Sequence, residues 1–167
     1  GVLGGLPLPC GLAGPDFNML WVNQELCDFL EKSGAPASYE GMTSGDFYYG
    51  NSGRETLSDK AIKTQIRQVD ELTITLPSGG EKTVRVTATP FFDMDGNLLG
   101  ALSLWVDLTE IRKQQHLVEQ QNERINSAAQ SAEEISQHLS GASEELAAQI
   151  EESSMGADAQ RERATET

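Results

Sequence analysis

Residues 84–110 decide the fold, and they read VRVTATPFFDMDGNLLGALSLWVDLTE. Apolar and polar residues alternate from 84 to 89, as in a half-buried antiparallel strand. Asp95-Gly96-Asn97 predicts a hairpin turn. Residues 98–106 are almost continuously apolar, which predicts a central strand buried on both faces. The stretch therefore predicts two neighbouring antiparallel strands.

A long helix is predicted to begin directly after the second strand. Asp107 and Glu110, three residues apart, form the pattern of a capping box, and Thr109 is an alternative cap. From Asp107 to Thr167 there is no proline, and the first glycine is Gly141. Apolar or small residues recur every seven positions, at Ile111, Val118, Ile125, Ala132, Leu139 and Leu146. About five heptads of this kind predict a left-handed coiled coil.

This helix predicts a homodimer. A single helix would leave its seam in water, and packing supplies most of the stability of an amphipathic helix. The alternative is a surface helix of one globular domain, but such helices are ordinarily far shorter. We therefore expect residues 109–167 to pair in parallel register with a second copy of the chain.

Shorter elements are predicted upstream of residue 84. They are a strand over 72–76, a turn at 77–80, a helix over about 54–68, a helix over 24–32 capped by Asn23, and a strand over 18–22. Residues 1–14 are expected to be extended or loop because of their prolines, and residues 37–58 are expected to be irregular. This order of elements predicts an α+β domain followed by a long helix.

Composition narrows the function classes. The 167 residues carry a formal net charge of −14, and no basic patch favours nucleic acid or an anionic membrane as a partner. No apolar run approaches the roughly 18 residues of a membrane span, and residues 1–14 lack the basic start of a signal peptide. The missing initial Met and the end inside a helical pattern indicate a fragment. We expect a cytoplasmic module, whose parent would be anchored in the inner membrane only by sequence outside these residues.

Four segments carry a family resemblance. Residues 84–90, 93–100 and 105–110 resemble the last two strands and the exit motif of a PAS domain, which commonly ends in Asp, an aliphatic residue and Thr. Trp21-Val22-Asn23 and the following helix resemble its second strand and first helix. Over about residues 6–110, the resemblance implies a five-stranded antiparallel sheet with flanking helices. It also implies a sensor domain at 1–108, whose Asp107 and Thr109 couple it to the helical segment 109–167.

The helical segment has a resemblance of its own. Residues 142–152 and 160–167 resemble the start of the signalling helix of bacterial methyl-accepting chemotaxis transducers. In that family the tip that binds the histidine kinase and its coupling protein would lie beyond residue 167. The resemblance implies candidate methylation sites at Glu144, Glu145, Glu151 and Glu152, although Gln149 and Met155 depart from the family's small flanking residues. An ordinary solvated helix face is the alternative for these glutamates.

A ligand site is expected inside the domain, because aromatic cavities with a few polar groups are typical small-molecule sites. The candidate residues are Trp21, Asn23, Cys27, Tyr39, Phe47, Tyr48 and Trp105, and Tyr49 belongs to the same aromatic group. Ordinary core packing is the alternative for each of them. The cofactor is unknown.

Haem and flavin are not expected as cofactors. Both histidines, His116 and His138, fall in the long helix, so none remains as an axial haem ligand inside the domain. The sequence around Cys27 does not resemble the cysteine motif of flavin photoreceptors. Cys10 and Cys27 lack metal-ligand spacing and fit reduced thiols. No metal site is predicted, and because no catalytic motif occurs the chain is not expected to be an enzyme.

Three functions follow from these expectations. The first is a sensor of a small ligand or of redox state in a chemotaxis transducer, relayed through the dimeric helix. The second is a PAS domain that dimerises and relays without a ligand. The third is the sensor of a histidine kinase, although His138 lacks the neighbours that phosphoacceptor helices usually show. A sizeable cavity would favour the first function over the second.

Overall fold

The computed structural model describes residue 5 and residues 7–166. It contains two compact units, Gly1–Gln114 and Gln115–Thr167. The elements are β1 (Cys10–Ala13), β2 (Met19–Val22), α1 (Gln24–Phe29), η2 (Pro36–Tyr39), α2 (Ser44–Tyr49), α3 (Leu57–Thr64), β3 (Gln68–Thr75), β4 (Glu81–Phe92), β5 (Leu98–Asp107) and α4 (Thr109–Thr165).

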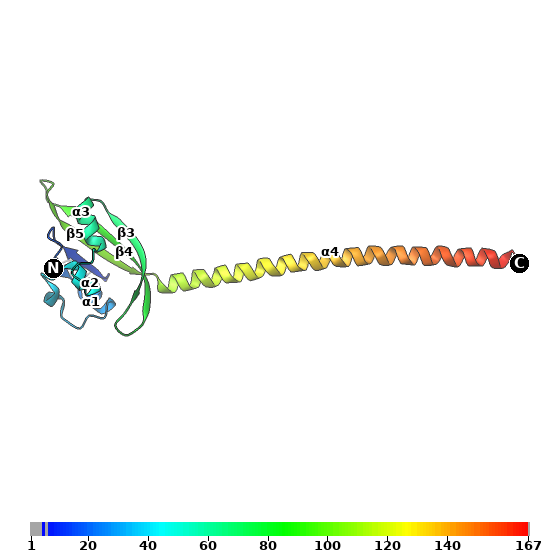
Figure 1. Ribbon diagram of the computed structural model, residues 1–167, viewed down its shortest axis with the longest axis horizontal. Coiled ribbons are helices and arrows are strands. Elements are labelled where there is room, and N and C mark those ends of the chain that lie inside the picture. The colour runs from blue at the N-terminus through cyan, green and yellow to red at the C-terminus, as the bar shows by residue number, and fades with distance from the viewer. Residues whose placement is uncertain (1–4, 6, 167) are drawn as a thin grey trace. The chain divides into compact units, whose positions relative to one another are not determined.

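The first unit is built on one antiparallel sheet with the strand order β2-β1-β5-β4-β3. Figure 1 labels β3, β4 and β5 of this sheet. The prediction of a PAS-like α+β fold with a five-stranded antiparallel sheet, flanking helices and a long C-terminal helix is confirmed. β5 is the central strand, as predicted. The hairpin before it is also confirmed: Gly96 has a φ of 85°, and the Asp93 carboxylate accepts the N–H groups of Asp95 and Asn97 at 2.9 and 2.8 Å.

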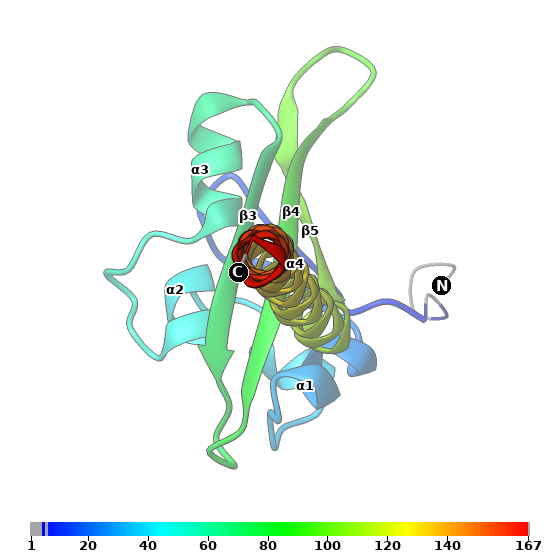
Figure 2. The ribbon, with the colours of Figure 1, turned by 90° about the vertical axis from the view of Figure 1, so that its right-hand side faces the viewer.

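The helices pack on one face of this sheet. α3 contacts β3, β4 and β5, and α1 contacts β1; Figure 2 shows α2 and α3 on the same side of β3. On β5, Trp105 is buried, whereas Leu102 and Leu104 are only partly buried and Val106 is 44% exposed. The prediction that residues 98–106 are buried on both faces is therefore wrong, because among the described residues the helices cover one face only.

Two segments hold elements that their sequence did not predict. β1 lies within residues 1–14, α2 lies within residues 37–58, and η2 begins at Pro36, one residue before the latter segment. α2 has a clear local cause: the Thr43 hydroxyl accepts the N–H of Asp46 at 3.2 Å, and Gly50 ends the helix in the left-handed conformation. These are ordinary start and stop signals, but α2 is too short to show a helical period.

Both predicted helices of the domain are shorter than expected. α3 begins after a capping box, in which Thr56 accepts the N–H of Asp59 at 3.1 Å and Asp59 accepts the N–H of Thr56 at 2.9 Å. It ends where Gln65 adopts a φ of 55°. α1 ends at Phe29 rather than at residue 32, because the chain turns through Glu31, which also has a φ of 55°.

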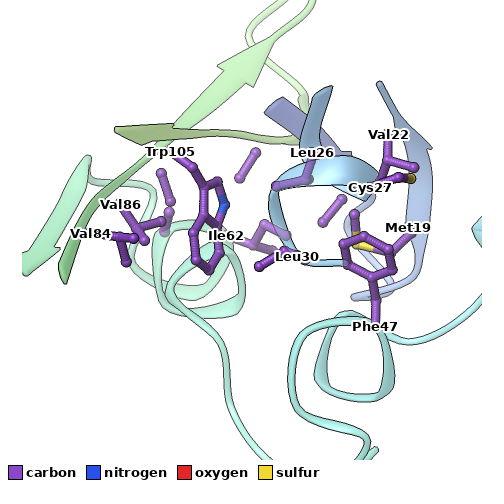
Figure 3. Packing of buried hydrophobic residues seen from close by; sticks show 14 residues of the cluster. Met19, Val22, Leu26, Cys27, Leu30, Phe47, Ile62, Val84, Val86 and Trp105 are labelled. Carbon is purple, nitrogen blue, oxygen red and sulfur yellow. The ribbon is translucent and has the colours of Figure 1, made fainter. Parts of the chain in front are cut away.

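The core lies between the sheet and these helices. Buried side chains of β2, α1, α2, α3, β4 and β5 meet there, as Figure 3 shows for Met19, Val22, Leu26, Cys27, Leu30, Phe47, Ile62, Val84, Val86 and Trp105. The strands also approach closely. At Gly100 a Cβ atom would collide with the carbonyl oxygen of Ala13, so this position of β5 requires glycine.

The second unit is the continuation of α4, which runs without a break from Thr109 to Thr165. None of its described residues is buried, and Ile111, Val118, Ile125, Leu139 and Leu146 are each more than half exposed. The seam predicted from the heptads is therefore present on a single chain as an uncovered row. Among the described residues, no helix is both long and apolar enough to cross a membrane.

Candidate functional site

A cavity of about 480 Å³ lies between the helices and β3. Its lining comes from Leu30 and Lys32 after α1, from Tyr48, Tyr49 and Gly50 at the end of α2, from Arg54, from residues 72–77 of β3 and the following turn, and from Trp105 of β5. A second cavity of about 60 Å³ shares Tyr48, Tyr49, Leu72 and Trp105 with it. The larger volume is within the range of small-molecule sites.

Tyr48 and Trp105 form the wall between the two cavities. Their rings stack with centroids 5.2 Å apart and planes 22° from parallel. The Tyr48 hydroxyl lies 2.8 Å from the Ser103 hydroxyl, which donates to the carbonyl oxygen of Gly11 at 3.2 Å. Because the Ser103 proton is engaged there, Tyr48 is the donor to Ser103. The chain of hydrogen bonds thus joins α2 to β5 and β1.

The polar atoms of this wall are held in an apolar interior. Burial raises the pKa of Tyr48 to about 12. The indole N–H of Trp105 is buried and has no hydrogen-bond acceptor among the described residues. The indole N–H lies near the Tyr48 hydroxyl and partly offsets the effect of burial on the pKa of Tyr48. The geometry between the two groups is nevertheless not that of a hydrogen bond. Such an unpaired buried donor is unusual, and here it belongs to a residue that lines both cavities.

Tyr48→Phe is expected to lower the free energy of unfolding at neutral pH by about 1 kcal/mol, because one hydrogen bond is lost. It should also change the pH dependence. Since the folded pKa is raised from 10.0 to about 12, the folded state keeps a proton that the unfolded state releases, so wild-type stability falls as the pH rises from 10 to 12. Urea unfolding at neutral pH and across this range checks both effects. Equal slopes in wild type and variant would show that Tyr48 does not cause the loss.

Two cations stand at the larger cavity. Lys32 is half-buried, and its ammonium lies 5.0 Å from the centre of the Phe47 ring. Arg54 is exposed, and its guanidinium carbon lies 3.9 Å from the centre of the Tyr49 ring. Burial lowers the pKa of Lys32.

The sequence analysis does not single out either cation, since neither belongs to a motif. It also omits Ser103, whose inward position could have been predicted from its alternation with Ala101 and Trp105.

The predicted ligand-site residues fall into three groups. Tyr48 and Trp105 line the cavities. Phe47, Tyr39 and Cys27 belong to the core around them: Phe47 and Cys27 are fully buried, and the Tyr39 ring meets Phe47 edge-on at 5.2 Å. Asn23 is a structural cap, and Trp21 is remote from the cavities.

Asn23 and Trp21 have clear placements. The amide oxygen of Asn23 accepts the N–H groups of Leu26 and Cys10 at 2.9 and 3.0 Å, which ties the start of α1 to β1. Trp21 pairs with Leu12, next to Gly11, whose missing side chain would point at Leu26 and Tyr48 on the helical face. Since neighbours on a strand alternate, Trp21 faces the opposite side of the sheet.

The junction between β5 and α4 differs from the predicted capping box. Asp107 ends β5, and its carboxylate accepts the N–H and the hydroxyl of Thr109 at 2.9 and 2.6 Å. Glu110 instead pairs with Lys113 at 3.5 Å. The box is therefore wrong, because Leu108 still pairs with β4 and α4 begins only at Thr109.

The same residues fasten the start of α4 to the sheet. The N–H of Leu108 donates to the carbonyl oxygen of Thr83 at 2.8 Å, and the Thr109 hydroxyl accepts the N–H of Thr83 at 3.0 Å. Burial opposes ionisation of Asp107, but the hydrogen bonds from Thr109 outweigh it and hold the pKa of Asp107 below its ordinary value. Asp107 and Thr109 thus lie together at the exit of the domain.

A charged cluster stands next to this exit. Glu71 of β3 pairs with Arg85 of β4 and with Arg112 in the first turns of α4. Hydrogen bonds from these two guanidinium groups lower the pKa of Glu71. Solvent-exposed pairs contribute little stability individually, but this one carboxylate connects two strands with the helix.

The remaining predicted residues lie in the second unit. Glu144, Glu145, Glu151 and Glu152 are all exposed on α4, so their carboxylates are accessible on a single chain.

In the first unit, Cys10 and Cys27 are free thiols, and burial raises the pKa of each. The described residues contain no group of His, Cys, Asp or Glu side chains arranged to hold a metal ion.

Residues 3–113 match a protein family described as the PAS fold. The chain belongs to the PAS family. The match covers the whole sheet, its helices and the start of α4, which is the region where the exit motif and the hairpin had indicated this family. PAS domains are generally sensory rather than catalytic, and this fold supports a role in sensing signals.

Solved structures show the same fold at low identity. The PAS domain of BvgS from Bordetella pertussis is 20% identical with a TM-score of 0.50, over 71% of this chain and 92% of that one. VqmA from Vibrio cholerae is 18% identical with a TM-score of 0.53, over 66% of this chain and 50% of that one. An RNA-binding light-oxygen-voltage receptor is 16% identical with a TM-score of 0.56, over 73% of this chain and 35% of that one. The comparison with curated proteins found no match.

Proposed function

We propose that this PAS domain senses a small molecule and passes the signal to a dimeric α4 in a bacterial chemotaxis transducer. The observation that carries the proposal is the position of two residues on β5. Trp105 forms a wall of the cavity, and Asp107, two residues later, holds the first turn of α4. A change at the cavity wall therefore has a path of two residues to the helix start.

The cavity supports ligand binding over a ligand-free relay. Its volume of about 480 Å³ is sufficient for a small organic molecule, and its walls combine aromatic rings with a few polar groups. Native mass spectrometry of the purified chain tests this directly. A bound small molecule at one per domain is the expected result, and the same cavity without any binder among screened compounds would favour the relay alone.

The dimeric relay is supported by the uncovered apolar row of α4. Ile111, Val118 and Ile125 are 53%, 53% and 64% exposed on one chain, and a parallel partner helix would bury them. In the proposed parent, the kinase and its coupling protein would bind the transducer beyond residue 167, so this chain would reach them only through α4. We propose no nucleic-acid partner.

Methylation of the paired glutamates is the finer part of the proposal. Glu144 and Glu151 are seven residues apart, as are Glu145 and Glu152, so each set repeats on one face of α4. Methyl esterification would remove a negative charge, and repulsion between carboxylates on paired helices would fall accordingly. Incubation with a chemotaxis methyltransferase, followed by mass spectrometry of peptides, would assign the modified residues.

Asp107→Ala is expected to uncouple the helix start while leaving the domain folded. Loss of such a cap costs roughly 0.5–2 kcal/mol, which is small against domain stability but comparable to allosteric couplings of about 1–3 kcal/mol. In the full-length parent the ligand response should weaken at normal expression. In the isolated chain, hydrogen exchange at the Thr109 amide should quicken.

Asp95→Ala is the matched control for this prediction. Asp95 lies in the exposed hairpin between β4 and β5, so its replacement removes an acid without touching the junction. A wild-type ligand response in Asp107→Ala would show that the junction only connects the two units.

A further inference from the structure

The larger cavity is lined by cations and by no acid. Lys32 and Arg54 are its charged lining residues, and the lining contains neither Asp nor Glu. This is unusual in a chain with a net charge of −14. The lining of the cavity therefore carries positive charge, whereas the molecule as a whole is negative. A low-dielectric wall strengthens this local positive field.

Neither cation is neutralised by the protein. Some basic residues of the domain have carboxylate partners: Lys63 pairs with Glu55, and Arg85 and Arg112 pair with Glu71. Within the described part of the chain, Lys32 and Arg54 make no salt bridge. They lie over the rings of Phe47 and Tyr49 instead. Such contacts use the face of the ring and leave N–H donors of the ammonium and guanidinium groups for an acceptor.

The other walls are mostly apolar and aromatic, with Thr73 and Thr75 as polar exceptions. Leu30, Leu72, Ile74, Leu76 and Pro77 line the cavity together with Tyr48, Tyr49 and Trp105. A ligand that filled these walls would need an apolar body, and one that met the N–H donors of Lys32 and Arg54 would need an anionic or strongly accepting end.

We propose that the cavity takes a small organic carboxylate, with its carboxyl group toward Lys32 and Arg54 and its alkyl or aromatic body against Tyr48, Leu72 and Trp105. The proposal rests on the ligand-sensing function above and names the chemical class of its ligand. Inorganic phosphate fits less well, because it has no apolar part to cover these walls. The carboxylate would also give the half-buried ammonium of Lys32 the counter-ion that the protein does not supply.

The two tryptophans make a direct test. The chain has only Trp21 and Trp105, so its nitrogen–proton spectrum has two indole signals, which the Trp21→Phe variant assigns. Trp105 lines the cavity and Trp21 lies on the far face of the sheet, so Trp21 is an internal control. Benzoate and hexanoate are expected to shift the Trp105 signal in a saturable manner, with Trp21 unchanged. Benzamide, hexanamide and inorganic phosphate are expected to shift it much less at equal concentration.

Charge removal tests the role of the two cations. Lys32→Met with Arg54→Met keeps the apolar stems and is expected to weaken benzoate binding about tenfold or more, since hydrogen bonds to charged groups are among the strong ones. Binding of benzamide should be unchanged. Lys113→Met on α4 is the matched control, and it should bind benzoate as the wild type does.

The outcomes separate this inference from the proposed function. If benzamide binds as tightly as benzoate, or if the double variant keeps benzoate affinity, the carboxylate inference is overturned while ligand sensing stands. If phosphate alone shifts Trp105, or if none of the probes does, the inference is again overturned. Ligand sensing itself is judged separately, by the molecule that co-purifies with the chain and by the response of the parent.

Discussion

Phe47→Ala is expected to lower the free energy of unfolding of the domain by about 3–5 kcal/mol, the usual loss for a large aromatic side chain removed from a core. Phe47 is fully buried, and its ring meets Tyr39 and Tyr48 edge-on at 5.2 and 4.8 Å. The variant would lose these ring contacts and leave a void between α2 and the sheet. Because small domains are stable by only about 5–15 kcal/mol, this loss brings the domain close to unfolding.

Urea unfolding followed by circular dichroism measures the effect. Phe92→Ala is the control, since Phe92 lies at the end of β4 and is 41% exposed, and its replacement should change the free energy of unfolding by less than about 1 kcal/mol. Similar losses in the two variants would show that Phe47 has no special part in the core. A folded Phe47→Ala domain would also report whether Tyr48 keeps its stacking on Trp105 without this support.

Ile125→Asp is expected to weaken dimerisation by about 3–5 kcal/mol, the range found when a charge is left buried without a partner. That corresponds to at least a hundredfold in the dissociation constant. Ile125 lies in the uncovered row of α4 and is 64% exposed on a single chain. In a parallel dimer it would face the same residue of the partner, so two carboxylates would meet in the seam.

Sedimentation velocity over a range of concentrations measures the change. Ser127→Asp is the matched control, because it adds the same charge two residues away and outside the predicted seam. It should dimerise as the wild type does. An unchanged dimer in Ile125→Asp would contradict the coiled-coil interface, and an equal loss in both variants would show that total charge rather than the seam is responsible.

The parts of the fold that sequence predicted well have strong local patterns. β4 and β5 alternate or are continuously apolar around a hairpin whose turn residues leave few alternatives. α4 repeats its heptads far beyond the length of an ordinary helix. Such patterns repeat within one segment, so the element can be predicted without knowing what packs against it.

The missed parts depend on tertiary neighbours. β1 has four residues and pairs with both β2 and β5. Its segment is rich in Gly and Pro, and no pattern within it predicts a strand with two neighbouring strands. Burial of β5 on one face only follows from where the helices pack. The residue type of Trp21 favours a place at the cavity, whereas its face of the sheet is set by the register with Leu12.

The site shows the same division. Tyr48 and Trp105 could be named in advance from their residue type, since aromatic side chains with a few polar groups are typical of small-molecule cavities. Lys32 and Arg54 could not, because their place beside the cavity follows from the turns that end α1 and α2. Asp107 and Thr109 were found from the exit motif, but their actual bonds depend on Thr83 of a neighbouring strand.

The pairing of β5 on both sides limits the kind of movement that can carry a signal. β5 is held by β1 along Ala101–Leu104 and by β4 along almost its whole length. Sliding the strand by one residue would break both ladders and turn Trp105 to the opposite face. In the proposed relay we therefore do not expect a piston stroke along β5, since it would break both ladders at once. A change of dihedral angles within the two-residue step from Trp105 to Asp107 keeps both ladders, and in the proposed relay it would alter how tightly the first turn of α4 is wound.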